Sequence, residues 1–240
     1  MSDNIGQRFI KETSYLSDIG DEPEILNEPF PPNPELKSFT DLVAFEPSAG
    51  LQKIISQRRT VRLFEDKPIS LECLSKLIWG VQGVTATKGA NSLRSVASAG
   101  NRHPLNTYVV ANNVEGIAKG LYFYDRINDR IGLLRNDSFE NELNEASLGQ
   151  SMVNECCVTF IWTAVSARTT ERYQARGYRY IFLDAGHIGA QIQLLCCDMG
   201  LGSCNIAAYL DDSLAKFLNL KSEFEFPVYM TVVGWPKLDQ

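Results

Sequence analysis

The chain has 240 residues, of which 44% are hydrophobic and 22% charged, an ordinary globular composition that excludes a disordered or fibrous protein. The formal net charge of −6 and the isoelectric point near 5.1 argue against nucleic acid or an anionic membrane as the main partner. The longest nearly apolar run, Cys156 to Ala167, is too short to span a bilayer, and the first ten residues lack the pattern of a signal peptide. We therefore expect a soluble, cytoplasmic protein.

The first fifty residues contain six of the ten prolines. A stretch such as NEPFPPNPEL (27–36) cannot form a helix or a central strand. The sequence therefore predicts a Pro-rich extended arm over residues 1–50, of which residues 22–50 lie on a body formed by residues 51–240. The large apolar residues of the arm are expected to pack on the same subunit or on a partner, and they are Phe30, Leu36, Phe39 and Phe45.

Helices and strands interleave from Gln52 onward, without the regular period of a doubly wound sheet. Ser70 is the predicted N-cap of a helix that ends at Gly83. Residues 180–199 carry apolar side chains all round and predict a buried central helix that ends at Gly200. Short β-rich runs predict strands at 107–111, 121–124, 158–165, 203–207 and 227–233.

The six cysteines have no zinc-ligand spacing, and Cys156–Cys157 falls in a strand-like run. We interpret them as small buried side chains in a reducing compartment. His103 and His187 are the only histidines in the sequence. This scarcity argues against a histidine-based metal site or a catalytic triad, although one histidine could serve as a base. No metal is expected.

Positive charge is concentrated in residues 47–114, which hold nine basic and three acidic residues, whereas the rest of the chain holds 14 and 26. Such a segment in an acidic protein favours the binding of a small anion, and the alternative is a solvated face of Lys and Arg. In an extended conformation Arg58, Thr60 and Arg62 share one face, with Arg59 opposite. Two guanidinium groups and a hydroxyl suit a phosphate group.

Two further stretches combine small and polar residues. Residues 98–104 (SAGNRHP) would let backbone amides approach a flat ring closely, with a plain turn as the alternative. Residues 200–208 (GLGSCNIAA) contain a G-x-G, but they follow a helix and enter a strand, the reverse of a dinucleotide fingerprint. No P-loop, H-E-x-x-H or G-x-S-x-G motif is found.

Several segments, in order along the chain, resemble the nitroreductase-like flavoproteins, and most closely their SagB-type branch, which includes thiazoline and oxazoline peptide dehydrogenases. They are SQRRTVRLF (56–64), PISLECLSKLIWGVQGVT (68–85), ASAGNRHPLNTYVV (97–110), GLYFYD (120–125), GYRYIFLDAGHIGAQIQLL (177–195), DMGLGSCNIAAYLDDSLAKFLNL (198–220) and VYMTVVGWP (228–236). The resemblance covers about residues 50–236. It implies an α+β fold with a central, mostly antiparallel sheet wrapped by helices, and a homodimer with FMN at the subunit interface.

The resemblance also implies which residues contact FMN. Residues 58–60 would hold the phosphate and ribityl chain, and Arg62 would lie near the N1/O2 side of the ring. Residues 98–101, from the other subunit, would line the isoalloxazine, and the backbone of 206–208 would face N5. Lys237 is the one basic residue after the final G-x-P, where many members place phosphate contacts. The full set is Arg58, Arg59, Thr60, Arg62, Ser98, Ala99, Gly100, Asn101, Ile206, Ala207, Ala208 and Lys237.

Two departures from the family pattern bear on the chemistry. The usual Pro-Ser-Ala-Gly begins with Ala97 here. Azoline-oxidising members carry a Lys-Tyr pair ahead of the central helix, and the matching residues here are Arg172 and Tyr173. Arginine is a poor general base, which counts against azoline oxidation and leaves Tyr173 as a candidate acid. The alternative for this pair is a surface helix face.

The expected function is that of an FMN-dependent oxidoreductase, transferring hydride via flavin N5 between NAD(P)H and a small organic acceptor such as a nitro compound or quinone. A positive charge near N1/O2 stabilises the reduced flavin. One alternative is a SagB-type dehydrogenase that oxidises a substrate such as a peptide azoline, with oxygen as acceptor. Another is a non-catalytic flavin-binding protein. Substrate specificity is expected to come from residues 168–178 and the partner's arm.

Overall fold

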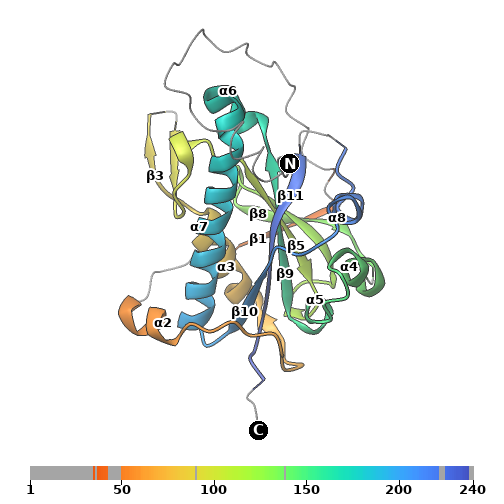
Figure 1. The fold of residues 1–240 in the computed structure, drawn as a ribbon. Coiled ribbons are helices and arrows are strands. Elements are labelled where there is room, and N and C mark those ends of the chain that lie inside the picture. Colours follow the sequence, from red (N-terminus) through yellow and green to blue (C-terminus); the bar gives the residue numbers. More distant parts are fainter. Residues whose placement is uncertain are drawn as a thin grey trace, which may run out of the picture.

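The computed structural model describes residues 35, 37–42, 50–89, 91–137, 139–221 and 225–237 (Figure 1). The strands of its central sheet are β1 (Ser38–Asp41), β5 (Leu105–Ala111), β7 (Gly120–Asp125), β8 (Arg130–Arg135), β9 (Val158–Val165), β10 (Gly202–Ile206) and β11 (Glu225–Gly234). They lie in the order β1-β8-β7-β5-β9-β11-β10, and every neighbouring pair is antiparallel. The predicted α+β fold with a central antiparallel sheet is confirmed.

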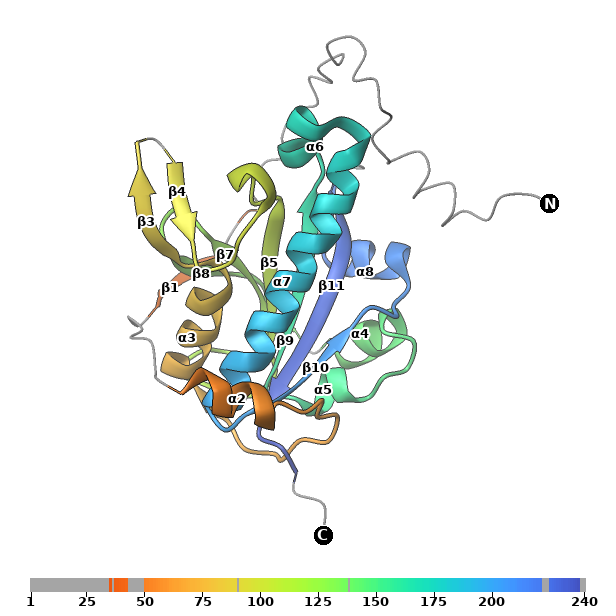
Figure 2. The same cartoon turned by 60° about the vertical axis from the view of Figure 1, so that its left-hand side comes forward.

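Four short strands lie outside this sheet, and none of them carries a predicted site residue. They are β2 (Ile69–Ser70), which pairs in parallel with β6 (Val114–Glu115), and β3 (Val84–Lys88), which pairs antiparallel with β4 (Asn91–Arg94). Figure 2 shows that the β3–β4 hairpin projects from the body beside α7 (Gly177–Asp198).

Helices cover both faces of the sheet (Figures 1 and 2). The helices are α2 (Leu51–Gln57), α3 (Leu71–Gln82), α4 (Glu140–Ala146), α5 (Met152–Glu155), α6 (Ala167–Tyr173), α7 and α8 (Asp211–Phe217), with 3-10 turns η1 (Ala99–Asn101) and η2 (Gln174–Arg176). Side chains of β9 alternate between two cores: Phe160 and Trp162 pack with α3 and α7, and Ile161 packs with α4 and α8. Because both faces are covered, β9 is buried along its whole length.

The local signals in the sequence correctly predicted the main elements. Ser70 caps α3, its side chain accepting a hydrogen bond from the backbone N–H of Cys73 at 3.1 Å, and the helix ends before Gly83. The strand predicted at 158–165 has those bounds, and the other predicted strands are found within two residues at either end. These signals were reliable because each combined a capping or turn residue with a periodic apolar pattern.

The prediction that the central helix is buried all round is only partly right. One side of α7 buries Ile181, Ala185, Ile188 and other side chains against the sheet. The opposite side leaves Phe182 48% and Leu183 58% exposed. The sequence is apolar on both sides, and in the described part of the chain these two side chains remain exposed.

Only part of the predicted arm lies within the described residues. Its residues 38–41 form β1, which adds an antiparallel edge strand to β8, and Lys37 N–H donates to the Leu133 carbonyl at 2.6 Å. Phe30, Leu36, Phe45 and the side chain of Phe39 lie outside the described residues. The division into an arm (1–50) and a body (51–240) stays a prediction. Within the described ranges, no helix has the length and apolarity needed to cross a bilayer.

Candidate active site

The basic segment predicted to bind phosphate runs alongside β10, the edge strand of the sheet. Thr60 pairs with Ser203 in a parallel bridge, and Val61 N–H donates to the Ser203 carbonyl at 2.9 Å. The approach requires Gly202, because a Cβ there would lie 2.6 Å from Val61. Residues 58–62 are thus held along the outer edge of β10.

The C-terminal segment reaches the same edge. Phe64 pairs antiparallel with Pro236, and Lys237 N–H donates to the Leu63 carbonyl at 3.0 Å. The fold therefore brings Lys237 close to the basic segment of residues 58–62, although it lies at least 175 residues later in the sequence. This juxtaposition depends on the tertiary structure and could not be read from spacing.

Some side chains at this edge form hydrogen bonds within the chain, and others do not. Arg59 folds back, donating to the carbonyls of Ser56 at 3.1 Å and Arg58 at 2.8 Å. By contrast, the side chains of Arg58, Thr60 and Lys237 have no hydrogen-bond partner within the described part of the chain. Two cationic groups and a hydroxyl on one edge match the donors that a phosphate-bearing cofactor needs, so these residues fit FMN.

Arg62 lies next to Cys204 in β10. Burial raises the pKa of the Cys204 thiol, and the charge and hydrogen bond of Arg62 oppose that rise. Arg62 is itself exposed, so its guanidinium can still meet a ligand at this edge. It is the member of the basic segment nearest to the middle of β10.

The end of β10 offers backbone rather than side chains. The Ile206 side chain is 3% exposed and belongs to the core with α4 and α8, whereas Ala207 and Ala208 are exposed. The Ala208 carbonyl accepts a hydrogen bond from Gln150 at 2.9 Å. A flat ring placed here would meet small side chains and peptide groups.

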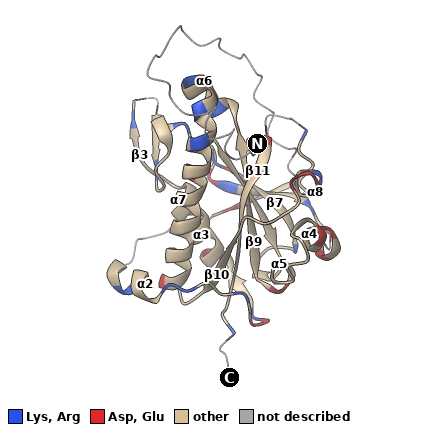
Figure 3. Cartoon of the chain, viewed as in Figure 1, with Lys and Arg blue, Asp and Glu red and all other residues tan. Residues whose placement is uncertain are grey.

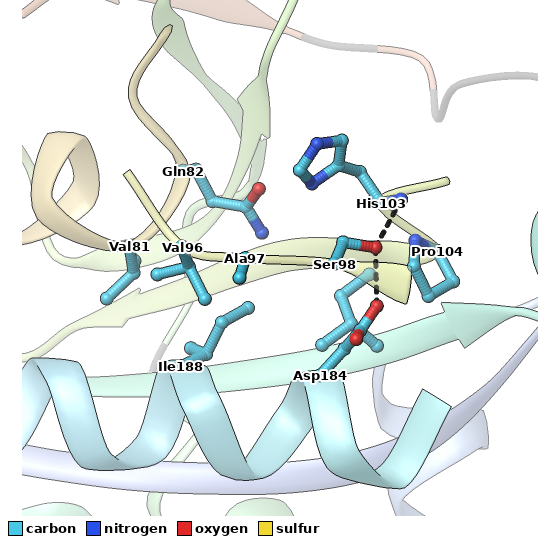
Figure 4. Close-up of a pocket in the computed structure, with 10 residues that line it drawn as sticks. Val81, Gln82, Val96, Ala97, Ser98, His103, Pro104, Asp184 and Ile188 are labelled. Carbon is cyan, nitrogen blue, oxygen red and sulfur yellow. Dashed lines mark hydrogen bonds between the residues drawn. The ribbon is translucent and has the colours of Figure 1, made fainter. Parts of the chain in front are cut away.

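The second predicted group, Ser98 to Asn101, is held on α7 by Asp184 (Figure 4). Ser98 Oγ donates to Asp184 Oδ2 at 2.5 Å and Ala99 N–H donates to Asp184 Oδ1 at 3.2 Å. Ser98 Oγ also accepts from His103 N–H at 2.8 Å. The hydroxyl is therefore engaged in shaping η1.

Asp184 was not singled out in the sequence, although an acidic residue inside an otherwise apolar helix was a usable signal. Burial raises the pKa of this carboxyl, and the hydrogen bonds from Ser98 and Ala99 oppose the rise. The cavity beneath it, between α3 and α7, is about 10 Å³, which is about the space of one water molecule. This cavity is too small for a flavin ring.

The backbone of η1 adopts an unusual conformation. Gly100, Asn101 and His103 have φ of 56°, 60° and 46°, in the left-handed region. The Asn101 amide donates to the Ser92 carbonyl at 3.1 Å, and its Oδ1 lies 2.7 Å from His103 Nε2. The Asn101 side chain is therefore occupied within the chain, and the backbone of residues 99–101 remains as the surface offered to a ring.

The predicted catalytic pair lies beside this turn. A Cβ at Gly100 would be 2.4 Å from the Tyr173 hydroxyl, so the phenol oxygen lies directly over the glycine. The Tyr173 ring packs edge-on against Tyr180 with 4.7 Å between centroids, and the Arg172 guanidinium lies 5.4 Å from the Tyr173 ring centroid. The structure therefore brings Tyr173 together with residues 98–101.

The basic segment and the η1 turn lie at different positions along the length of α7. Asp184 anchors η1, whereas the Cys197 thiol contacts the Ile54 carbonyl of α2, just before the basic segment. The thirteen residues between Asp184 and Cys197 correspond to about 20 Å of helix. The phosphate-binding candidates and the η1 turn thus lie apart from each other within one chain.

Comparison with known proteins shows the family. The nitroreductase family profile matches residues 55–235. A protein of Methanocaldococcus jannaschii that is named a nitroreductase is 30% identical over 184 residues, which cover 77% of this chain and 90% of that protein. The trifolitoxin-processing protein TfxB of Rhizobium leguminosarum bv. trifolii is 29% identical over 180 residues, covering 71% of this chain and 48% of TfxB. The chain thus spans about half the length of TfxB.

Solved structures share the fold. A protein of Anabaena variabilis described as a nitroreductase superposes with a TM-score of 0.76 at 21% identity, covering 96% of this chain and 47% of that one. A chain of the Escherichia coli microcin synthetase McbBCD complex superposes with a TM-score of 0.66 at 16% identity, covering 96% and 86%. Since the family profile spans most of the chain and the archaeal relative matches over nearly its whole length, the chain belongs to the nitroreductase family of oxidoreductase enzymes.

Proposed function

We propose that the chain is an FMN-dependent oxidoreductase that transfers hydride between NAD(P)H and a small organic acceptor, of the nitro or quinone type. The observation that carries this proposal is the set of free donors at the β10 edge, Arg58, Thr60 and Lys237. These donors match a phosphate group, and the family typically binds a flavin. When bound, FMN supplies the hydride chemistry at N5, and the protein supplies binding, orientation and charge.

We propose a homodimer in which each flavin contacts both subunits. The exposed apolar side of α7, with Phe182 and Leu183, supports this assembly, because a soluble chain rarely leaves such a stripe in water. In a two-fold dimer whose axis is perpendicular to α7, the two copies of the helix run in opposite directions, so residues near one end of a helix face residues near the other end of its partner. The η1 turn of one subunit would then meet the basic segment of the other.

Within such a composite site each residue has a distinct task. The side chains of Arg58, Thr60 and Lys237 bind the phosphate. Arg62 places positive charge near N1/O2, where the reduced ring is anionic. Asp184 holds η1 in place, and Tyr173 holds a proton beside Gly100, where it can be donated to a substrate stacked on the ring.

The test is an absorbance spectrum of the purified protein, recorded before and after anaerobic addition of NADPH and then of NADH. Flavin bands that bleach, and return when a nitro compound or quinone is added, are the expected result. A colourless protein that takes up no added FMN would refute the proposal. Bands that persist with both nicotinamides would leave a flavin protein that uses another donor.

The dimer is tested by Leu183→Glu, which puts a charge into the proposed interface. We expect sedimentation to show a monomer and the bound flavin to be lost. The matched control is Leu148→Glu, because Leu148 is 55% exposed and lies in the turn between α4 and α5 on the other face of the sheet. Loss of flavin without dissociation, or an equal effect of both variants, would contradict the composite site.

A second candidate function is oxidation of an organic substrate with oxygen as acceptor. The similarity to TfxB and to the McbBCD chain favours it, as does the Tyr173 hydroxyl next to Gly100. Arg172 is exposed, and a guanidinium group is a poor general base, so Tyr173 is the group available for proton transfer. This function predicts flavin that is reduced by substrate but only slowly by nicotinamides.

A further inference from the structure

A second basic cluster, distinct from the β10 edge, surrounds an open cavity of about 280 Å³. Its walls come from four places in the sequence: η1, the residue after it, the turn between β7 and β8, and the start of α6. The lining residues are Asn101, Arg102, Arg126 and Arg168. Figure 3 shows basic residues gathered on α6 and at the adjoining end of α7, above the sheet.

Two arginines of this cavity, Arg126 and Arg168, are positioned by neutral oxygens. Arg126 donates to the His103 carbonyl at 3.1 Å. Arg168 donates to Asn106 Oδ1 at 2.8 Å and to the Pro104 carbonyl at 3.3 Å. Neither of them forms an ion pair with any carboxylate in the described part of the chain. Arg102 differs, because it pairs with Glu171 and donates to the Arg168 carbonyl.

The positive charges of Arg126, Arg168 and Arg94 of β4 lie close enough to one another to lower the pKa values of Arg126 and Arg168. Burial, together with the charges of Arg126 and Arg94, lowers the pKa of Arg168 to about 10, whereas Glu225 and Tyr108 oppose the shift. The pKa of Arg126 is lowered by burial and by Arg94, with Tyr124 opposing.

Two carboxylates near the cluster attract its arginines without forming an ion pair with them. Asp129 attracts Arg94, but it also accepts a hydrogen bond from the Tyr124 hydroxyl at 2.7 Å. Glu225 attracts Arg168, but it accepts from Asn106 at 2.8 Å and from Thr163 at 2.5 Å. Partly desolvated guanidinium groups that face a common cavity need an anion for charge balance.

The chemistry of the walls specifies an oxyanion. A guanidinium presents a planar fork of donors that matches a carboxylate or a phosphate, and the Asn101 amide is already bonded to Ser92 and near His103. Arg126 and Arg168 would therefore bind the oxyanion, and Arg102 would contribute while it also pairs with Glu171. The volume exceeds that of one oxyanion group and suits part of a small organic molecule.

The cavity also adjoins the proposed flavin site. Asn101 belongs both to the wall and to the turn proposed to line the ring, and Arg168 precedes Tyr173 by five residues on α6. We propose that this cavity binds the carboxylate or phosphate group of the substrate, so that the enzyme acts on acidic small molecules in preference to neutral ones of the same shape. The substrate class rests on the proposed function, whereas the oxyanion site does not.

The experiment compares 4-nitrobenzoate, 4-nitrophenyl phosphate and neutral 4-nitrobenzamide with the flavin-loaded protein. Affinity is measured by calorimetry, and kcat/KM is measured with the nicotinamide that bleaches the flavin. We expect at least one of the two anions to bind at least tenfold more tightly than the amide, and to show a kcat/KM at least tenfold higher. The anion with the larger ratio of kcat/KM to that of the amide shows whether the cavity prefers a carboxylate or a phosphate group.

Arg126→Gln should reduce the anion-to-amide ratio by tenfold or more, and Arg126→Lys should restore part of it. The control is Arg135→Gln, since Arg135 pairs with Glu142 at 3.0 Å on the α4 side and should leave the ratio intact. Equal affinity of wild-type protein for both anions and the amide would overturn the proposal whether or not Arg126→Gln folds. Anion-selective binding that depends on Arg126, without reduction of any acceptor, would support the cavity and refute the proposed function.

Discussion

Replacing Gly100 by alanine tests the contact between the η1 turn and Tyr173. Gly100 has φ of 56°, where an L-residue costs about 1–2 kcal/mol. The new Cβ would also lie 2.4 Å from the Tyr173 hydroxyl, a distance at which one of the two groups must move. Because the Tyr173 ring is packed edge-on against Tyr180, we expect this displacement to add about 1 kcal/mol.

Two further variants separate the backbone cost from the contact. Gly149→Ala has a similar φ of 74° and no atom within 4 Å of its Cβ, so it measures the backbone cost alone. In a Tyr173→Phe background the hydroxyl is absent and the nearest ring atom lies 3.2 Å away, so Gly100→Ala should cost about 1 kcal/mol less than in the wild type.

Urea unfolding, followed by circular dichroism at one protein concentration without added flavin, gives the free energies. For a chain of this size, 1 kcal/mol corresponds to about 2–4 °C in Tm, so a thermal melt checks the ranking. The expected order of stability loss is Gly100→Ala above Gly149→Ala. If the two glycine variants cost the same, and Tyr173→Phe leaves the cost of Gly100→Ala unchanged, Tyr173 does not lie over Gly100.

Two other predictions concern charge. Arg62→Ala should weaken FMN binding by about tenfold and make the flavin potential more negative, because it removes a charged donor proposed to lie near N1/O2. Fluorescence titration measures the FMN affinity, and a redox dye measures the potential. An equal effect of Lys53→Ala would contradict the proposed position of Arg62. Burial, together with Arg94 and Arg126, lowers the pKa of His103 from 6.5 to about 4. The unfolded chain therefore binds this proton at a higher pH than the folded one, and stability should fall as the pH drops from about 6.5 to about 4. His103→Asn, which tolerates the left-handed backbone, should show a shallower fall in urea unfolding over that range, and parallel curves would count against the assignment.

The sequence predicted α3, α7 and five strands of the central sheet because those signals are local, whereas β8 and the shorter helices were not predicted. Ser70 caps α3 through its own hydrogen bond to Cys73, and β9 is a continuous apolar run because both of its faces are covered. The antiparallel sheet and the family followed from motifs in a fixed order, which a single chain can display without any contact being known.

The arrangement of the site depended on contacts between distant residues. Lys237 joins the basic segment only because Pro236 pairs with Phe64, and no spacing in the sequence encodes that pairing. Asp184 acquires its role from the Ser98 hydroxyl, which is 86 residues away. The exposed side of α7 could not be told from a buried one, because apolar side chains look the same in sequence whether they meet the sheet or a second surface.

The sequence by itself therefore predicted the central helix, the capped helix and five strands, the fold class through the family resemblance, and the basic segment of residues 58–62. Only the tertiary structure decided that residues 98–101 lie apart from that segment and under Tyr173, and that Arg102, Arg126 and Arg168 share a cavity. The physical reason is that capping, periodicity and turn preferences act within a few residues. The convergence of charges from η1, the β7–β8 turn and α6 is instead set by how the sheet and α7 pack together.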